Sequence, residues 1–134
     1  MIETKNILLV DDHGSFRNAL ARVLDWHPDF RVVNQAGTLA EARRLAAQDG
    51  FDIAIIDLFL PDGSGMDLIR ELRQAKRRAG LLLLTINLNY AQHAQAIEDG
   101  ADGVLEKSVS VAEIIGAVER LVDKKSSERT LREA

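Results

Sequence analysis

Five short apolar runs alternate with segments of helical spacing along this chain, and this alternation constrains the fold more than any other feature. Most of these runs are almost continuously apolar, which is typical of strands buried on both faces of a parallel sheet. The second run has a partly polar face and is expected nearer an edge. The expected strands are Lys5–Val10, Phe30–Val33, Phe51–Asp57, Leu81–Thr85 and Val104–Lys107.

The segments between the runs carry apolar residues at the spacing of amphipathic helices. The expected helices are Ser15–Trp26, a segment capped by Thr38 and closed by Asp49-Gly50, Met66–Arg78, Tyr90–Asp99, and a segment from Ser108 or Ser110 to about Val122. Regular strand–helix alternation with right-handed crossovers predicts an α/β fold, in which helices cover both faces of a doubly wound, five-stranded parallel sheet.

Composition restricts the classes of protein that this chain can belong to. Its 134 residues suit one domain, and its formal net charge of −4, from 17 basic and 21 acidic residues, argues against a nucleic-acid surface over the whole chain. There is no cysteine, which excludes thiol chemistry and fits the cytosol, and no apolar stretch could cross a membrane. We therefore expect a cytoplasmic chain without membrane contact. Residues 1–124 would form one domain, and 125–134 a polar tail or the start of an interdomain linker.

The stretch Phe51–Gly65 contains an apolar run that ends in one carboxylate, Asp57. A lone acid in so apolar a segment is costly unless it is paired or bound to a cation. The turn Pro61–Gly65 follows. This stretch alone leaves two interpretations open: Asp57 is a chemically active group at the end of a central strand, or it is an ordinary aspartate that caps the next turn.

The other strand ends also carry polar groups, and in a doubly wound sheet such groups collect at the carboxyl edge. These groups are Asp11 and Asp12, Asp57, Thr85 and Lys107. Converging carboxylates repel one another, and a hard divalent cation such as Mg²⁺ relieves that repulsion. Such an ion can hold a phosphoryl group beside a carboxylate nucleophile, which can form an acyl phosphate. Thr85 and Lys107 are then placed to hold the phosphoryl oxygens.

With these residues the chain resembles the receiver domains of bacterial two-component response regulators. The matching features are Asp11-Asp12, Asp57, Thr85, Lys107 and the turns Leu60–Gly65 and Gly100–Gly103, within roughly residues 5–124. The triplet Asp11-Asp12-His13 and the serine after Lys107 are most similar to receivers of LuxR/NarL-type DNA-binding regulators. The fold that this resemblance implies is flavodoxin-like, with strand order 2-1-3-4-5.

The resemblance also implies how such a chain signals. Asp57 would accept a phosphoryl group from a sensor histidine kinase, Lys107 would pair with that group, and Thr85 would move toward it. The result would be a population shift at the face formed by the fourth helix, the fifth strand and the fifth helix, and a possible homodimer through this face. The chain would promote its own phosphotransfer and dephosphorylation without being a conventional turnover enzyme.

The metal site that the resemblance implies uses Asp12, Asp57 and the backbone carbonyl of Phe59 to bind Mg²⁺, with Asp11 acting through water. No helix-turn-helix is present in this sequence. DNA would therefore be contacted only through an output domain absent from this chain, which makes a role in transcription regulation the expected one.

Besides the missing proline after Lys107, two positions depart from the family pattern, and the sequence leaves two alternative functions. Val104 stands where the family often has an aromatic switch residue, and Ile86 follows the hydroxyl residue where the family usually has a small side chain that leaves the site open. These departures favour a degenerate receiver that binds partners without phosphate, whereas the intact set of strand-end residues argues against it. A magnesium-dependent phosphatase with an aspartyl nucleophile is disfavoured, because its DxD pattern and cap insertion are missing.

Three further side chains are expected to have structural roles and no role in chemistry. His13 adjoins the acidic pair, but a surface or helix-entry role is expected rather than metal binding, since the histidines lack ligand spacing. Trp26 is expected in the core or at an interface, and Phe59 is expected to be a packing residue.

Overall fold

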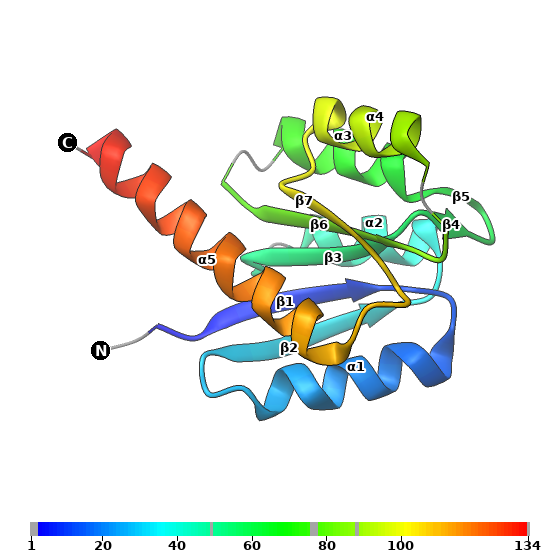
Figure 1. The fold of residues 1–134 in the computed structure, drawn as a ribbon, viewed down its shortest axis with the longest axis horizontal. Coiled ribbons are helices and arrows are strands. Elements are labelled where there is room, and N and C mark those ends of the chain that lie inside the picture. Colours follow the sequence, from blue (N-terminus) through cyan, green and yellow to red (C-terminus); the bar gives the residue numbers. More distant parts are fainter. Residues whose placement is uncertain (1–2, 49, 76–77, 88, 134) are drawn as a thin grey trace.

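In the computed structural model, which describes residues 3–48, 50–75, 78–87 and 89–133, the expected strands form one parallel sheet (Figure 1). Its strands are β1 (Lys5–Val10), β2 (Phe30–Ala36), β3 (Ile53–Asp57), β6 (Gly80–Thr85) and β7 (Gly103–Glu106). They lie in the order β2-β1-β3-β6-β7, while β4 (Phe59–Leu60) and β5 (Gly63–Ser64) pair as a separate antiparallel hairpin. The predicted fold class and strand order 2-1-3-4-5 are therefore confirmed.

Helices cover both faces of this sheet (Figure 1). They are α1 (Gly14–Trp26), α2 (Leu39–Ala47), α3 (Gly65–Ala75), α4 (Tyr90–Asp99) and α5 (Val111–Glu133). The predicted end of the third helix at Arg78 is wrong, because α3 ends at Ala75 and Arg78 already lies in a turn before β6. Residues 76 and 77, which that prediction also included, lie outside the described residues.

Neighbouring residues of a strand point to opposite faces of the sheet, so each central strand contributes to two cores. In β3, Ile53 and Ile55 belong to the core under α1 and α5, whereas Ala54 and Ile56 belong to the core under α2, α3 and α4. All four side chains are at most 2% exposed. Burial on both faces explains why this segment is apolar until its last residue, Asp57, reaches the edge of the sheet.

The helix α5 is longer than the sequence predicted. It runs to Glu133, although we expected it to end near Val122 and to be followed by a polar tail. No glycine or proline interrupts the added segment, and most of its residues have fair helix propensity, so polarity alone does not end the helix. The Nζ atom of Lys125 lies 3.0 Å from a carboxylate oxygen of Asp102, which ties the added segment to the body. The domain boundary near residue 124 stays a prediction.

Two contacts fix the turn that follows Asp57. The carboxylate of Asp62 accepts hydrogen bonds from the backbone N–H groups of Leu39 (2.7 Å) and Ala40 (2.9 Å) at the start of α2, and these bonds lower the pKa of Asp62. Gly65 opens α3 at a position where a Cβ atom would lie 2.0 Å from the backbone oxygen of Asp57. The end of β3 is therefore packed directly against the next helix.

Two aromatic residues lie at the surface. Trp26 is 91% exposed, because it lies two residues beyond the buried Leu24 and so on the opposite side of α1; of its two expected places, this excludes the core. Phe59 is 56% exposed between the buried Leu58 and Leu60, so the interpretation of Phe59 as a packing residue is wrong.

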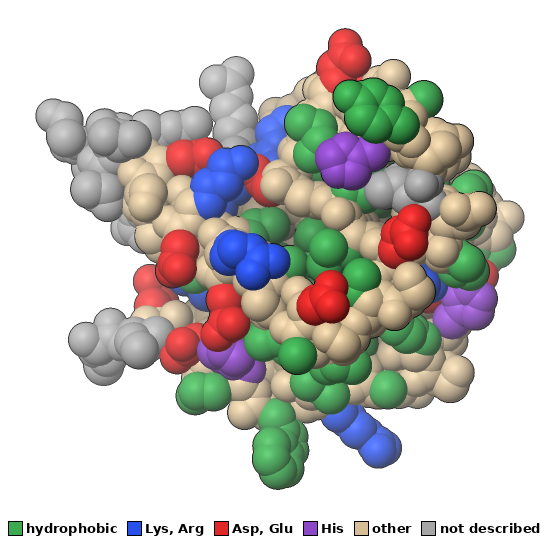
Figure 2. Space-filling model, in the orientation of Figure 1, with side chains coloured by type: hydrophobic (Ala, Val, Ile, Leu, Met, Phe, Trp, Pro, Cys, Tyr) green, Lys and Arg blue, Asp and Glu red, His purple; other side chains and the backbone are tan. Residues whose placement is uncertain are grey.

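On the face drawn in Figure 2, acidic and basic side chains of the described residues are interspersed with hydrophobic ones, without a large area of one sign. Within the described ranges, no helix has the length and apolar character needed to span a bilayer.

Candidate functional site

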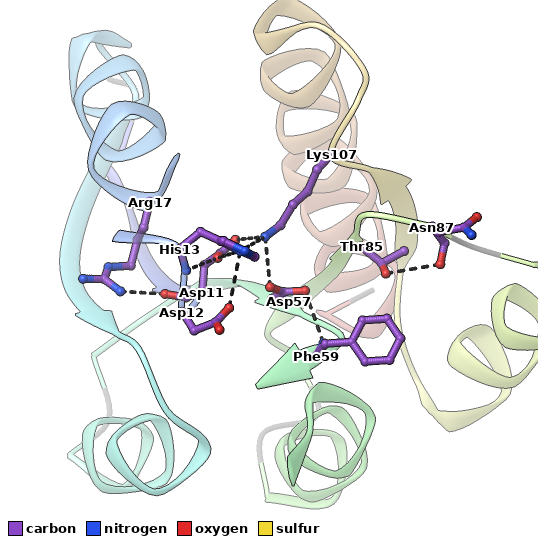
Figure 3. A network of polar contacts seen from close by, with 9 residues as sticks. All are labelled: Asp11, Asp12, His13, Arg17, Asp57, Phe59, Thr85, Asn87 and Lys107. Atoms are coloured by element: carbon purple, nitrogen blue, oxygen red, sulfur yellow. Dashed lines mark hydrogen bonds and ion pairs between the residues drawn. The ribbon is translucent and has the colours of Figure 1, made fainter. Parts of the chain in front are cut away.

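The residues singled out at the strand ends meet at one edge of the sheet, as the topology predicts (Figure 3). Asp11 and Asp12 follow β1, Asp57 ends β3, Thr85 ends β6 and Lys107 follows β7. Because the four strands are parallel neighbours, groups up to 96 positions apart in the sequence come within contact distance.

Asp57 lies at the centre of this group and is 2% exposed. Its Oδ1 atom accepts a hydrogen bond from the backbone N–H of Phe59 at 3.2 Å, and its Oδ2 atom accepts one from Nζ of Lys107 at 2.9 Å. Burial raises the pKa of Asp57, and the negative charge of Asp11 adds to this rise against the opposing effect of Lys107. Asp57 is thus a buried carboxylate held in place by one cation.

The first two acids differ in their surroundings. Asp11 is 1% exposed, and its Oδ1 atom accepts a hydrogen bond of 2.8 Å from the backbone N–H of His13. Its Oδ2 atom has no hydrogen-bond partner within the described part of the chain, and its contact with Nζ of Lys107 at 2.7 Å is an ion pair. Asp12 is more open, with a side chain that is 35% exposed. The pair therefore offers one buried and one accessible carboxylate.

Lys107 supplies the positive charge of the site. Its backbone N–H donates to the carbonyl of Thr85 at 2.8 Å, which fixes the start of its side chain, and its Nζ atom also lies 4.9 Å from the centre of the Phe16 ring. Burial alone would lower the pKa of Lys107, but its close contacts and charge interactions with Asp11 and Asp57 outweigh burial and raise it. The ammonium consequently stays charged between two carboxylates.

Thr85 is fully buried and lies at the border of this group. Its hydroxyl donates a long hydrogen bond of 3.5 Å to the carbonyl of Asn87 and points to this loop in Figure 3. The next residue, Ile86, is 60% exposed, and Val104 packs against the core under α2, α3 and α4. A narrowing of the access to Asp57 by Ile86, which replaces the small side chain usual in the family, stays a prediction.

His13 is a site residue that sequence reasoning undervalued. It is the N-cap residue of α1, as the helix-entry interpretation expects, yet its side chain makes no capping hydrogen bond. Its Nδ1 atom instead lies 3.1 Å from Nζ of Lys107 and 3.4 Å from carboxylate oxygens of both Asp11 and Asp12. Direct adjacency to Asp12 was the sequence signal for this placement.

A cation could be held here by groups already in place. Asp11, Asp12, His13 and Asp57 each offer one ligand atom, and these four atoms lie within 4.8 Å of one another. Three of the four groups are carboxylates, the donor type that suits Mg²⁺. The donor set and the partly accessible Asp12 fit a magnesium ion that keeps several waters.

Comparison with known proteins places the chain in a family. The profile of the response regulator receiver domain family matches residues 7–119. The chain therefore belongs to the response regulator receiver domains. Receiver domains bind Mg²⁺ at an acidic pocket of this kind, interact with histidine kinases and can dimerise.

Its relatives are regulators of the LuxR/NarL type. The chain is 35% identical to the DNA-binding transcriptional activator DevR/DosR of Mycobacterium tuberculosis over 112 residues, which cover 84% of this chain and 52% of that protein. The chain thus spans about half the length of the curated relatives that it matches.

Solved structures agree with this placement. A LuxR-family two-component response regulator from Aurantimonas superposes with a TM-score of 0.82 at 32% identity, covering 96% of this chain and 99% of that one. A response regulator from Burkholderia pseudomallei, with a phosphorylated aspartic acid, a calcium ion and citrate, has a TM-score of 0.78 at 33% identity and covers 97% of this chain and 75% of that one.

Proposed function

We propose that Asp57 accepts a phosphoryl group from a sensor histidine kinase and that this chain is the switching domain of a LuxR/NarL-type transcription regulator. The observation that carries the proposal is the pairing of a buried carboxylate with one ammonium: Oδ2 of Asp57 lies 2.9 Å from Nζ of Lys107. A related structure with a phosphorylated aspartic acid supports it.

In the proposed reaction, a carboxylate oxygen of Asp57 attacks the phosphorus of a phosphohistidine. The new O–P bond gives an acyl phosphate, while the P–N bond breaks and its electron pair returns to the imidazole, which is left neutral after proton uptake. Lys107 would then pair with the phosphoryl oxygens, and its raised pKa keeps it cationic for this task. Later hydrolysis of the acyl phosphate would reset the chain, so that it acts in single cycles and not as a conventional turnover enzyme.

Mg²⁺ is the proposed cofactor. Asp12, Asp57 and the backbone carbonyl of Phe59 would bind it, and Asp11 would act through a water molecule. The bound ion would neutralise charge on the phosphoryl oxygens. The protein's own contribution is to hold two nearly buried carboxylates, Asp11 at 1% and Asp57 at 2% exposure, beside the more accessible Asp12.

The switch would work through Thr85. Among the described residues its hydroxyl makes only a long hydrogen bond, to Asn87, so little is lost when it turns toward a phosphoryl group on Asp57. Such a turn would alter the face formed by α4, β7 and α5 and favour a homodimer through it. DNA would be bound through a separate output domain, and the protein would act in the cytoplasm.

The phosphorylation proposal is tested with Mg²⁺ and a small phosphodonor such as acetyl phosphate, followed by intact-mass analysis. We expect a single phosphoryl adduct on the wild-type chain and none on Asp57→Asn. Absence of an adduct, together with absence of Mg²⁺-dependent binding of beryllofluoride, would favour a degenerate receiver. Multiple turnover of an unrelated phosphate ester would favour a phosphatase.

The homodimer proposal has its own test by sedimentation velocity with and without beryllofluoride. We expect a larger sedimentation coefficient with beryllofluoride for the wild type and no change for Thr85→Ala. Equal sedimentation of the wild-type chain in both conditions would remove the dimer from the proposed function and leave the phosphorylation chemistry untouched.

A further inference from the structure

The imidazole of His13 faces the acidic group from the start of α1 (Figure 3). Its Nδ1 atom lies 3.4 Å from Oδ1 of Asp11 and 3.4 Å from Oδ1 of Asp12. The backbone N–H of His13 donates to Asp11 at 2.8 Å, which fixes the residue at this place. The imidazole therefore offers a nitrogen atom within 4.8 Å of a ligand oxygen of each carboxylate in the proposed magnesium site.

The contact with Lys107 indicates which way this nitrogen presents its lone pair. An ammonium group has only hydrogen-bond donors, so a hydrogen bond across the 3.1 Å between Nζ of Lys107 and Nδ1 of His13 requires the tautomer in which Nδ1 accepts. The ring proton is then on Nε2, and the lone pair of Nδ1 is directed toward the place that the ammonium now takes between the carboxylates. A neutral imidazole in this tautomer is the form that binds metal ions.

The ammonium of Lys107 lies between two buried carboxylates whose negative charges require a cation nearby. It lies 2.7 Å from Oδ2 of Asp11 and 2.9 Å from Oδ2 of Asp57. Oδ2 of Asp11 is buried and has no hydrogen-bond partner among the described residues. Because this buried carboxylate oxygen faces an ammonium in an ion pair, the place between the two carboxylates already holds one positive charge, which indicates a preference for a cation independently of His13.

We propose that His13 is a nitrogen ligand at this site, through Nδ1, so that the site binds late first-row divalent cations such as Co²⁺ and Zn²⁺ in mixed nitrogen–oxygen coordination as well as Mg²⁺. This inference rests on the proposed metal site and adds a residue and a metal class to it. Mg²⁺ prefers oxygen and water, whereas imidazole suits the later metals, so His13 affects the two classes unequally.

The test compares the affinities of Co²⁺ and Mg²⁺ by isothermal titration calorimetry in the wild type, His13→Ala and the control His93→Ala, a second exposed histidine on α4. For His13→Ala we expect Co²⁺ affinity to fall on the order of 10-fold or more, while Mg²⁺ affinity changes by less than about 2-fold. His93→Ala should match the wild type for both ions. The ratio of the two affinities is decisive, since oxygen ligands alone already favour Co²⁺ over Mg²⁺.

A second readout identifies the ligand atom. In the Co²⁺-loaded protein, ligation by Nδ1 leaves a proton on Nε2 that exchanges with water, and NMR should show it as one strongly paramagnetically shifted resonance. This resonance should disappear in deuterium oxide and in His13→Ala, and it should persist in His93→Ala.

Three results would overturn the inference. An unchanged ratio of affinities in His13→Ala, with Mg²⁺ binding intact, would show that His13 is no ligand while leaving the proposed function standing. An equal loss of both ions in His13→Ala would indicate a structural role only. Failure of the wild type to bind either ion would reject the proposed metal site together with this inference.

Discussion

Asp11 and Asp57 share one cation: the Nζ atom of Lys107 lies 2.7 Å from Oδ2 of the first and 2.9 Å from Oδ2 of the second. Both acids are almost fully buried, at 1% and 2% exposure. Two carboxylates with one ammonium leave an excess negative charge in a place of low solvation, and this excess governs several measurable properties of the chain.

The first prediction concerns the charge of Asp57. Burial and the charge of Asp11 raise its pKa above the ordinary 3.8, so ionised Asp57 destabilises the fold at neutral pH, and this penalty disappears as the pH falls through the raised pKa toward 3.8. We expect Asp57→Asn to have a higher free energy of unfolding than the wild type at pH 7, by an amount that shrinks with acidification. Urea unfolding without divalent cations measures this, and a less stable variant at pH 7 would contradict it.

We expect Asp12 to be important for metal binding and to contribute little to the stability of the fold. Its side chain is 35% exposed, so Asp12→Ala should change the free energy of unfolding by no more than about 0.5 kcal/mol. Its loss should weaken Mg²⁺ binding on the order of 10-fold or more and slow phosphorylation by acetyl phosphate at limiting Mg²⁺. Calorimetric titration checks the affinity, with Glu98→Ala on α4 as the control. Undiminished Mg²⁺ affinity would remove Asp12 from the site.

Gly65 is expected to be intolerant of any side chain. An added Cβ would lie 2.0 Å from the backbone oxygen of Asp57 and 2.9 Å from Cγ2 of Ile56, so the end of β3 would have to shift. Gly65→Ala should lower the free energy of unfolding by about 2 kcal/mol or more and impair phosphorylation of Asp57.

A matched control for this prediction is Gly116→Ala within α5. There the nearest atom to an added Cβ is the end of the flexible Arg120 side chain, at 3.3 Å. Alanine is the better helix residue, so this variant should gain about 0.5–1 kcal/mol. Chemical denaturation followed by circular dichroism measures both variants, and equal effects would mean that the close approach at Gly65 is unimportant.

Asp102 is expected to hold α3, β6 and the extended α5 together. Its carboxylate accepts hydrogen bonds from the backbone N–H of Leu81 (2.9 Å) and from Nη2 of Arg73 (2.8 Å), and it pairs with Nζ of Lys125 (3.0 Å). Asp102→Ala would remove all three of these contacts and should therefore lower the free energy of unfolding by about 2–4 kcal/mol. Glu128→Ala, which removes only the exposed partner of Lys125, should stay within about 0.5 kcal/mol.

The contribution of Asp102 to the free energy of unfolding should also depend on pH. Burial alone would raise its pKa, but the Leu81 N–H, Lys125 and Arg73 together lower it below the ordinary value of 3.8. A lowered pKa in the fold gives stability that is present above 3.8 and is lost as the pH falls through the lowered value. The difference between the wild type and Asp102→Ala should therefore shrink in strong acid, as unfolding curves from neutral pH downward would show. A constant difference would contradict this account.

Much of the fold could be predicted from local patterns. The run at Ile53–Ile56 is apolar on every residue because β3 is covered on both faces, and Thr38 caps α2 as its place before a helical stretch suggests, accepting from the N–H of Glu41 at 3.1 Å. The sequence patterns gave a wrong prediction where a polar segment was expected to be irregular. The segment after Val122 is polar yet helical, since propensity and the contact of Lys125 with Asp102 act in the same direction.

The sequence pattern could not predict the directions in which side chains point. The guanidinium of Arg73, near the end of α3, donates to the carbonyl of Gly100 at 2.7 Å and to Asp102 at 2.8 Å. A basic residue at the end of a helix looks the same in the sequence whether it meets solvent or a buried acid, because its partner comes from a different loop.

The sequence by itself determined which chemical groups stand at the strand ends, including Asp57 and Lys107, because the order of strands and helices places parallel strand ends at one edge. Only the tertiary structure decided how these groups share their charges: one ammonium between Asp11 and Asp57, and the imidazole of His13 turned toward it. Electrostatic energies vary over a few ångströms, a scale that packing sets and sequence spacing does not.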